Sequence, residues 1–349
     1  HADDGDARTD IKGYVDLRNS YINLPIYAHD THLYFLRSFC GSFMDQIQAR
    51  ANGWCKVVGP LSNVNLEGDM EARGSIFVKP TGTVYTLHDA HIRMVPNEII
   101  FGRDTVADPQ GHIGIVTGGL HHNSLRHLTY DINIEAQNLL AYNHPKKQDK
   151  ESFWGIVYGT GNCRIKGGPG ETTMNIDLTP EKNTSLTYNA ASAGDAGPSN
   201  FIRWVGLQAA DAADTAGHTA RATARQAIVI PGYDDIPSDL HMNFVLHTNP
   251  NLTLGVLLDE TTGDNIRLNG SGIIRATYYN KGAFQLFGNY SVSYGQYNLT
   301  IQDIIRKQFI FQPGSTIAFG GDPFNAALNL KASYIINSVP LGDLGLGSS

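Results

Sequence analysis

Residues 284–334 alternate between apolar and polar side chains with a period of two, and this pattern limits what the chain can fold into. The apolar members of three alternating runs are Phe284, Leu286, Tyr290 and Val292, then Tyr297, Leu299 and Ile301, and last Leu328, Leu330 and Ala332. Successive side chains of a strand point to opposite faces, so each run predicts a strand with one apolar and one polar face. No charged side chain falls in the apolar set.

The same alternation extends through much of the chain. Further apolar sets are Leu128, Tyr130, Ile132, Ile134 and Ala136, then Met174, Ile176 and Leu178, and Leu240, Met242, Phe244 and Leu246. Turn sequences separate the runs, at residues 80–82, 108–111, 167–170, 262–264 and 280–282. Short connections of this kind join neighbouring antiparallel strands, so we expect a meander of on the order of 15–20 strands.

Helical signals are nearly absent. The longest candidates are residues 40–51 and 208–227, and the second has no apolar stripe that a helix could bury. Residues 190–237 are therefore predicted to form a long loop or linker that is partly mobile.

Composition and charge exclude several classes of function. Lys and Arg total 26 against 33 Asp and Glu, a net charge of -7, and this balance argues against a nucleic-acid partner. No apolar run reaches the ~20 residues of a membrane-spanning helix. The two ends of the sequence look like cuts inside a longer protein, so we expect any membrane anchor to lie outside it.

Candidate catalytic and metal-binding residues form no convincing set. His121, His122 and His127, with His112 nearby, lack a Cys or acidic ligand at a familiar spacing. His88 and His91 rank no higher, and the acidic turn at 259–264 lacks the ligand pattern of a calcium loop. We therefore expect no metal, no cofactor and no enzymatic activity.

Cys40, Cys55 and Cys163 make a sparse, odd set of thiols. A disulfide between Cys40 and Cys55 is one hypothesis for an oxidising compartment, and three free thiols are the alternative.

Strands with one apolar face and no helices to cover it have few ways to bury that face. A second sheet can pack against the first, the sheet can close into a barrel, or it can fold over lengthwise into a trough. Periodicity alone does not choose among the three.

One motif resembles a known family. Residues 309–323 read FIFQPGSTIAFGGDP, and they are preceded by LLDETTGD at 257–264, by GSG at 270–272 and by Gly288-Asn-Tyr290 with Gly295-Gln-Tyr297. These elements, with GHIG from Gly111, GLHH from Gly119 and FWGIVYGTG from Phe153, are similar to the C-terminal domain of the TamB family, the translocation and assembly module. The resemblance covers about residues 72–340.

The resemblance implies an all-β fold: an elongated antiparallel sheet, folded over like a trough, with an apolar inner groove. The expected organisation is an N-terminal strand region at 1–71, a first part of the groove at 72–189, the linker at 190–237 and a C-terminal part at 238–349. Within the motif, Gly314, Ser315, Asp322 and Pro323 are interpreted as structural, because Asp-Pro favours a turn.

The resemblance also implies a function. Members of the family are anchored in the inner membrane, cross the periplasm and act with an outer-membrane barrel of the TamA type, in phospholipid transport or in outer-membrane protein assembly. Either role is open for this chain, and a structural β-sandwich is a further alternative. In the transport hypothesis the groove binds phospholipid acyl chains, and its expected lining is Leu240, Met242, Phe244, Leu246, Phe284, Leu286, Tyr290, Val292, Leu299, Ile301, Leu328 and Leu330.

Overall fold

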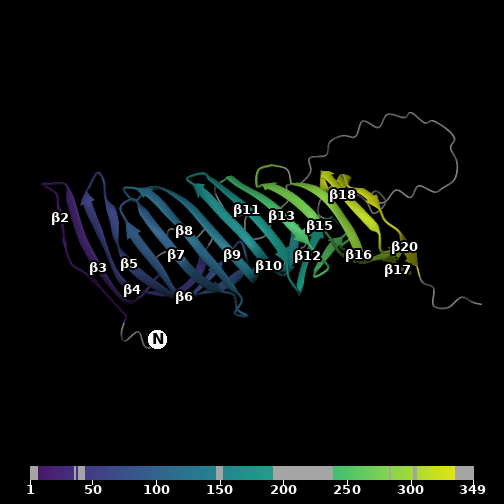
Figure 1. Cartoon of the computed structure of the whole chain (residues 1–349), viewed down its shortest axis with the longest axis horizontal. Coiled ribbons are helices and arrows are strands. Elements are labelled where there is room, and N and C mark those ends of the chain that lie inside the picture. The colour runs from purple at the N-terminus through teal and green to yellow at the C-terminus, as the bar shows by residue number, and fades with distance from the viewer. Residues whose placement is uncertain are drawn as a thin grey trace, which may run out of the picture.

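A computed structural model describes residues 7–34, 37, 44–146, 152–191, 239–282, 284–301 and 305–334. These residues form one continuous sheet of twenty strands. The molecule is elongated, and the strands are inclined to its long axis in chain order from β2 to β20 (Figure 1). The prediction of an all-β, folded-over sheet is confirmed.

The strands follow one another with short connections over most of the chain. In order they are β1 (Arg8–Ile11), β2 (Tyr14–Asp16), β3 (Tyr21–His32), β4 (Met44–Pro60), β5 (Asn65–Val78), β6 (Thr83–Val95), β7 (Glu98–Ala107), β8 (Ile113–Asn123), β9 (Arg126–His144), β10 (Phe153–Gly168), β11 (Glu171–Pro180), β12 (Thr184–Asn189), β13 (Asp239–Thr248), β14 (Leu252–Leu257), β15 (Asn265–Tyr279), β16 (Gln285–Ile301), β17 (Ile305–Phe311), β18 (Ser315–Gly321), β19 (Ala327–Asn329) and β20 (Ala332–Tyr334). A 3₁₀ helix at Pro323–Asn325 lies between β18 and β19.

Four of the five predicted turns lie between consecutive strands, and the turn at 167–170 overlaps the last two residues of β10; β3 to β11 form the expected antiparallel meander. Of the two helical candidates, residues 44–51 of the first belong to β4, while 208–227 lies outside the described residues. So does the predicted linker at 190–237, except for its first two residues.

Two pairings differ from a pure meander. Strand β11 pairs with β13 in parallel, and β12 pairs with β14 in parallel. Both β11 and β12 also pair with β10, along successive parts of the same edge. They therefore act as one long strand that is interrupted at residues 181–183. Parallel neighbours require a long connection, and residues 190–238 supply it.

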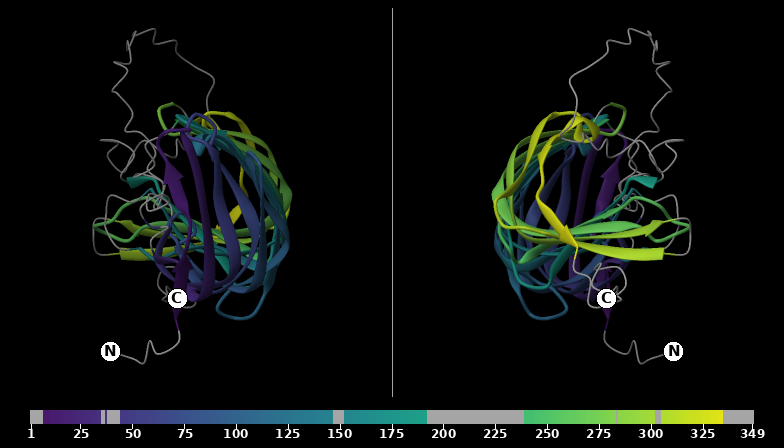
Figure 2. Two further views of the ribbon diagram at one scale, coloured as in Figure 1. Left: turned by 90° about the vertical axis from the view of Figure 1, so that its left-hand side faces the viewer. Right: turned by 90° about the vertical axis from the view of Figure 1, so that its right-hand side faces the viewer.

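The C-terminal third of the sheet folds into two walls that share bent strands. The first wall contains β11, β13, β18 and β19, and the second contains β12, β14, β17 and β20. Strands β10, β15 and β16 are long enough to pair with members of both walls. Seen from the C-terminal side in Figure 2, the yellow and green strands form an upright arc and a level shelf that meet at a corner.

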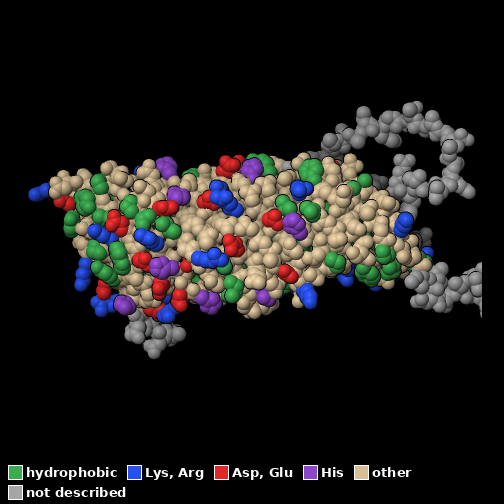
Figure 3. Space-filling model, in the orientation of Figure 1, with side chains coloured by type: hydrophobic (Ala, Val, Ile, Leu, Met, Phe, Trp, Pro, Cys, Tyr) green, Lys and Arg blue, Asp and Glu red, His purple; other side chains and the backbone are tan. Residues whose placement is uncertain are grey.

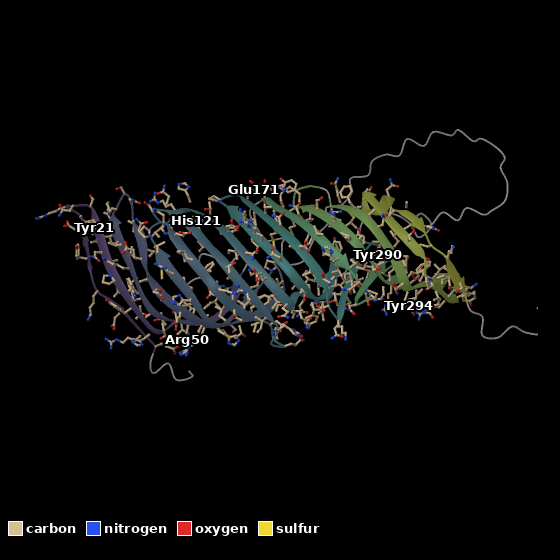
Figure 4. All side chains as sticks on the ribbon, in the orientation of Figure 1. Tyr21, Arg50, His121, Glu171, Tyr290 and Tyr294 are labelled. Carbon is tan, nitrogen blue, oxygen red and sulfur yellow. The ribbon has the colours of Figure 1, made fainter. Side chains whose placement is uncertain are left out.

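A β-bulge produces the bend in β16. Gly270 pairs with Val292 and Asn269 pairs with Tyr294, so Ser293 has no opposite residue. An extra residue bends the strand and moves the following side chains to the other face. Tyr290 is therefore 1% exposed while Tyr294, four residues later, is 53% exposed; Figure 4 labels both. The bulge also explains why the apolar positions are even-numbered up to Val292 and odd-numbered from Tyr297.

Polar side chains, buried Thr184 and half-buried Asn269, hydrogen-bond to backbone groups near the corner. Thr184 Oγ1 accepts a hydrogen bond from the N–H of Tyr158 and donates one to its carbonyl, both at 3.0 Å. Asn269 Nδ2 donates to the Leu252 carbonyl at 3.0 Å. Because an unpaired buried backbone group is costly, these side chains are part of what makes the fold possible.

Asp108, in the turn between β7 and β8, also hydrogen-bonds to a buried backbone group. Its carboxylate is fully buried, 2.9 Å from His112 Nδ1, and accepts from the N–H of Leu140 at 3.0 Å. Burial opposes ionisation of Asp108, but the hydrogen bonds from His112 and Leu140 outweigh it and hold the carboxyl pKa below its ordinary value. The short β7–β8 hairpin is thereby joined to β9.

We predict that Thr184→Val destabilises the fold by about 1–3 kcal/mol, because valine keeps the shape but removes the acceptor of the buried Tyr158 N–H. The Tyr158 carbonyl keeps its hydrogen bond from the N–H of Glu181 at 2.9 Å. Urea denaturation followed by circular dichroism measures the change. Thr187→Val, on the other face of the same strand, is the matched control. An unchanged midpoint for Thr184→Val, equal to that of the control, would contradict this account of the corner.

Candidate functional site

A row of uncharged side chains runs along the inner face of the sheet, from β3 to β15. Directly paired residues of neighbouring strands share a face, so the register defines the row residue by residue. Its members, called here the inner row, are Ala28, Gly53, Met70, Ile92, Phe101, Gly118, Ile132, Ile165, Met174, Met242 and Tyr278.

The next row along the strands lies on the outer face and has the opposite character. Its members are Tyr27, Trp54, Asp69, Arg93, Ile100, Gly119, Asp131, Lys166, Thr173, His241 and Tyr279. Charges there pair with one another: Asp131 contacts Arg164 at 2.9 Å and Lys166 at 3.0 Å. The hydrogen bond from Arg164, helped by that from Lys166, holds the pKa of Asp131 far below its ordinary range. Charged side chains and histidines are spread over the surface seen in Figure 3.

The inner row is open over most of its length and covered at one end. Met70, Ile92, Phe101, Ile132, Ile165 and Met174 are only half-buried, whereas Met242 is 3% and Tyr278 is 7% exposed. The change falls between β11 and β13. We call the part from β3 to β11 the open stretch and the part from β13 onward the covered third.

The second wall provides the cover. Its inner face carries a row of largely aromatic side chains: Phe153, Tyr188, Val256, Ile266, Tyr297, Phe309 and Tyr334. The ring of Phe153 contacts that of Phe284, which belongs to the first wall, with the centroids 5.9 Å apart. Phe284 in turn packs against Leu240, Met242 and Tyr278. Closer to the corner, one buried cluster joins Tyr290 and Val292 to Leu268 and Phe311.

Most of the lining residues expected from the sequence lie on the inner face of the covered third. Leu240, Met242, Phe244, Leu246, Phe284, Leu286, Tyr290 and Val292 belong to the first wall, and Leu299 faces inward on the second. Leu330 packs against the buried cluster at the corner, whereas Leu328, on the edge strand β19, is 54% exposed. Ile301 ends β16, and the placement of its side chain is outside what the structure describes.

The residues of the open stretch were not expected as lining residues from the sequence. Two of them, Ile132 and Met174, belong to alternating runs that the sequence shows clearly. Others, such as Met70 and Phe101, come from strands where glycines and bulges interrupt the alternation. Their place on the inner face follows only from the register.

The motif residues occupy the corner between β17 and β18 and its surroundings. Gly314 has a φ of +85°, which favours glycine. Ser315 is fully buried, and its hydroxyl donates to the Gln312 carbonyl at 2.8 Å and accepts from the N–H of Lys331 at 3.0 Å. The Asp322 carbonyl accepts from the N–H of Asn325, and Pro323 begins the 3₁₀ helix.

The histidines considered as metal ligands are dispersed. His112 pairs with Asp108, His121 Nδ1 lies 3.6 Å from Glu98, and His122 is buried, which lowers its pKa. Within the described ranges there is no group of three His, Cys, Asp or Glu side chains that could hold a metal ion. None of the helices among the described residues has the length and apolarity to span a bilayer.

Two thiols face the inner side of the sheet. Cys55 pairs with Ile26 and Gly68, and Cys163 pairs with Ile134 and Ile176, all in inward-facing rows. Burial raises the pKa of both thiols, and that of Cys163 reaches about 11. Cys55 and Cys163 are both free thiols in the structure, and Cys40 lies outside the described residues.

An elongated sheet, folded over along its length with an uncharged inner row, defines the molecule as a β-trough with an apolar floor. The chain belongs to the TamB family: the family model of the TamB C-terminal domain matches residues 102–343. The match confirms the resemblance seen in the sequence, although it begins at residue 102 rather than 72. Searches of curated proteins and of solved structures returned no match. The family consists of non-enzymatic assembly and transport modules, and membership gives this chain a role in the cell envelope.

We predict that Cys163 reacts slowly with N-ethylmaleimide at neutral pH and speeds up by about tenfold per pH unit between about pH 8 and 10. A pKa of about 11 leaves roughly one Cys163 thiol in a thousand ionised at pH 8. Peptide mass spectrometry of a Cys40→Ser variant follows Cys163, with Cys55 as the internal comparison. A rate for Cys163 that levels off below about pH 9 would show that the thiol is not desolvated on the inner face.

Proposed function

We propose that the chain conducts phospholipid acyl chains along its inner face, between the inner and outer membranes of the envelope. The observation that carries the proposal is the open stretch of the inner row, which is apolar, half-exposed and free of charge. Apolar side chains that are half-exposed in a continuous line are unusual unless something covers them in use. An acyl chain has the shape and the chemistry to do so.

The energetics favour this ligand. A tail of sixteen carbons has about 15 methylenes, each worth ~0.8 kcal/mol when removed from water, so its exposure costs on the order of 12 kcal/mol. A continuous apolar surface removes that barrier to movement. One charge facing the tail would restore part of it, and the inner row contains no charged residue.

The length of the open stretch also fits. Nine strands, β3 to β11, are separated by eight spacings of ~4.8 Å, which gives about 38 Å along the hydrogen-bonding direction. A phospholipid tail spans about half of a ~30 Å hydrocarbon core, or roughly 15 Å. The open stretch is therefore long enough for more than one tail in line, with headgroups in water at the open side of the trough.

The setting follows from the family. The chain would be held in the inner membrane by a segment outside this sequence, cross the periplasm and deliver its cargo to an outer-membrane barrel of the TamA type. The alternative role, assembly of outer-membrane proteins, would use exposed sheet edges to bind client strands. Among the described residues the edge strands β1, β2, β19 and β20 have only three or four residues each. The long inner row therefore supports the lipid proposal better.

The sealed β-sandwich considered above describes only part of the molecule. Its dry core corresponds to the covered third, where Tyr290 and Val292 are each 1% exposed. The half-exposed residues of the open stretch are what a sandwich does not account for.

We predict that Ile132→Asp lowers the amount of phospholipid that copurifies with the chain by at least about tenfold, since a carboxylate facing the tail costs more than ~1.4 kcal/mol. Ile132 is half-buried and faces an open side, so the fold should persist. Solvent extraction and lipid mass spectrometry give the bound lipid, and circular dichroism checks the fold.

Gln137→Asp, on the exposed outer face of the same strand, makes a closely similar change in charge. It should retain lipid at the level of the unmodified chain. Equal lipid content in both variants would refute the proposal, and unfolding of Ile132→Asp alone would show that this part of the inner face is a sealed core.

A further inference from the structure

The covered third ends the open stretch abruptly, and one aromatic contact marks the place. Phe153 begins β10 in the second wall, and Phe284 lies just before β16 in the first. Strand β16 begins in the first wall just after Phe284, passes the bulge at Ser293 and reaches the second wall at Tyr297. Phe284 therefore lies at the edge of the first wall that is far from the corner, called here its free margin. Phe153 belongs to the same row as Tyr297, yet its ring touches that of Phe284. The contact therefore joins the free margins of the two walls, opposite the corner.

Each ring is fixed mainly by its own wall. Phe153 lies 4.9 Å from Tyr188, its register partner on β12. The turn before Phe284 is held to β13, because Asn280 hydrogen-bonds both backbone groups of Leu240 and Lys281 pairs with Asp239. Between the walls, the Phe153–Phe284 contact is a meeting of phenyl rings. Rings can part without breaking a backbone ladder.

No room for a tail remains behind this contact. Leu240 and Met242 are 0% and 3% exposed, and Tyr290 and Val292 are each 1% exposed. A chain lying on the open stretch meets Met242 as the next member of the inner row after Met174. It cannot go further while the walls touch, since a close-packed interior leaves no space for it.

We propose that the Phe153–Phe284 contact is a closed gate: acyl chains occupy the open stretch, and they enter the covered third only when the walls separate at these two rings. The inference rests on the proposed function and adds to it a barrier at a defined position. It makes the covered third an exit that opens, rather than a permanent core.

The test locks the gate and maps where a lipid reaches. Phe153 and Phe284 are replaced by cysteine in a chain in which Cys40, Cys55 and Cys163 are alanine, and the pair is joined by a short bifunctional thiol reagent that contains a reducible disulfide. The probe is a phosphatidylcholine with a diazirine in one acyl chain, supplied from phosphatidylcholine vesicles. After illumination, peptide mass spectrometry locates the adducts.

With the clamp in place, adducts should form on Ile92, Phe101 and Ile132, and those on residues 285–292 should be about tenfold fewer than after reduction of the clamp. The matched control joins cysteines at Phe309 and Tyr334, which are in contact within the second wall at 5.6 Å. That clamp should leave the distribution of adducts unchanged.

Two results would overturn the gate. The first would leave the proposed function standing, and the second would overturn it as well. Adducts on residues 285–292 that are as frequent with the clamp as without it would remove the gate and leave lipid binding intact. A chain that shows no adducts on any inner-face residue, clamped or reduced, would overturn both the gate and the proposed function. Phe153→Ala without a clamp gives an independent check, because it should raise labelling of 285–292 while Phe309→Ala should not.

Discussion

The register of the strand pairs that hold the inner row, from β3 to β15, is the constraint on which the rest of the structure depends. A strand has a side-chain period of two, so a slip of one residue at any pair would bring Asp69, Arg93 or Asp131 onto the inner face. The inner row is uncharged because each pair keeps its register. Bulges accommodate the extra residues at the bends of the strands. Buried Thr184 and Ser315 hydrogen-bond to backbone groups of Tyr158 and Gln312, near the ends of strands at the corner.

Much of this fold could be predicted from the sequence, for a physical reason. Alternation is a local property, and it identified the strands around Ile132, Met174 and Tyr290 and the faces on which they lie. A bulge is not local, because it is defined by the strand opposite: Ser293 is extra only with respect to the pairs that Gly270 and Asn269 make. For the same reason, the parallel pairing of β11 with β13 depends on a connection whose path the sequence does not encode in any pattern.

The candidate site divides in the same way. The sequence predicted which side chains share an apolar face, such as Leu240, Met242 and Val292, and the structure places them together. Sequence patterns did not show what lies opposite them. The cover comes from Phe153 and Tyr188, which precede Phe284 by 131 and 96 residues and are brought near it only by the folding of the sheet. A lining and a core have the same alternation, and only the facing wall distinguishes them.

Side-chain volume on the inner face then separates the open stretch from the covered third. Near the bends of β4 to β6 the buried residues include Ala49, Ala51, Ala72 and Ala90, while in the covered third they include Tyr278, Tyr290 and Phe311. Both regions are built from the same continuous sheet. The small residues let neighbouring strands pack closely at the bend, whereas the aromatic rings of the covered third fill the space between its two walls. In the proposed function, the residues at inward positions therefore set where an acyl tail would lie. The covered third would admit a tail only if a wall moved, because its side chains are closely packed.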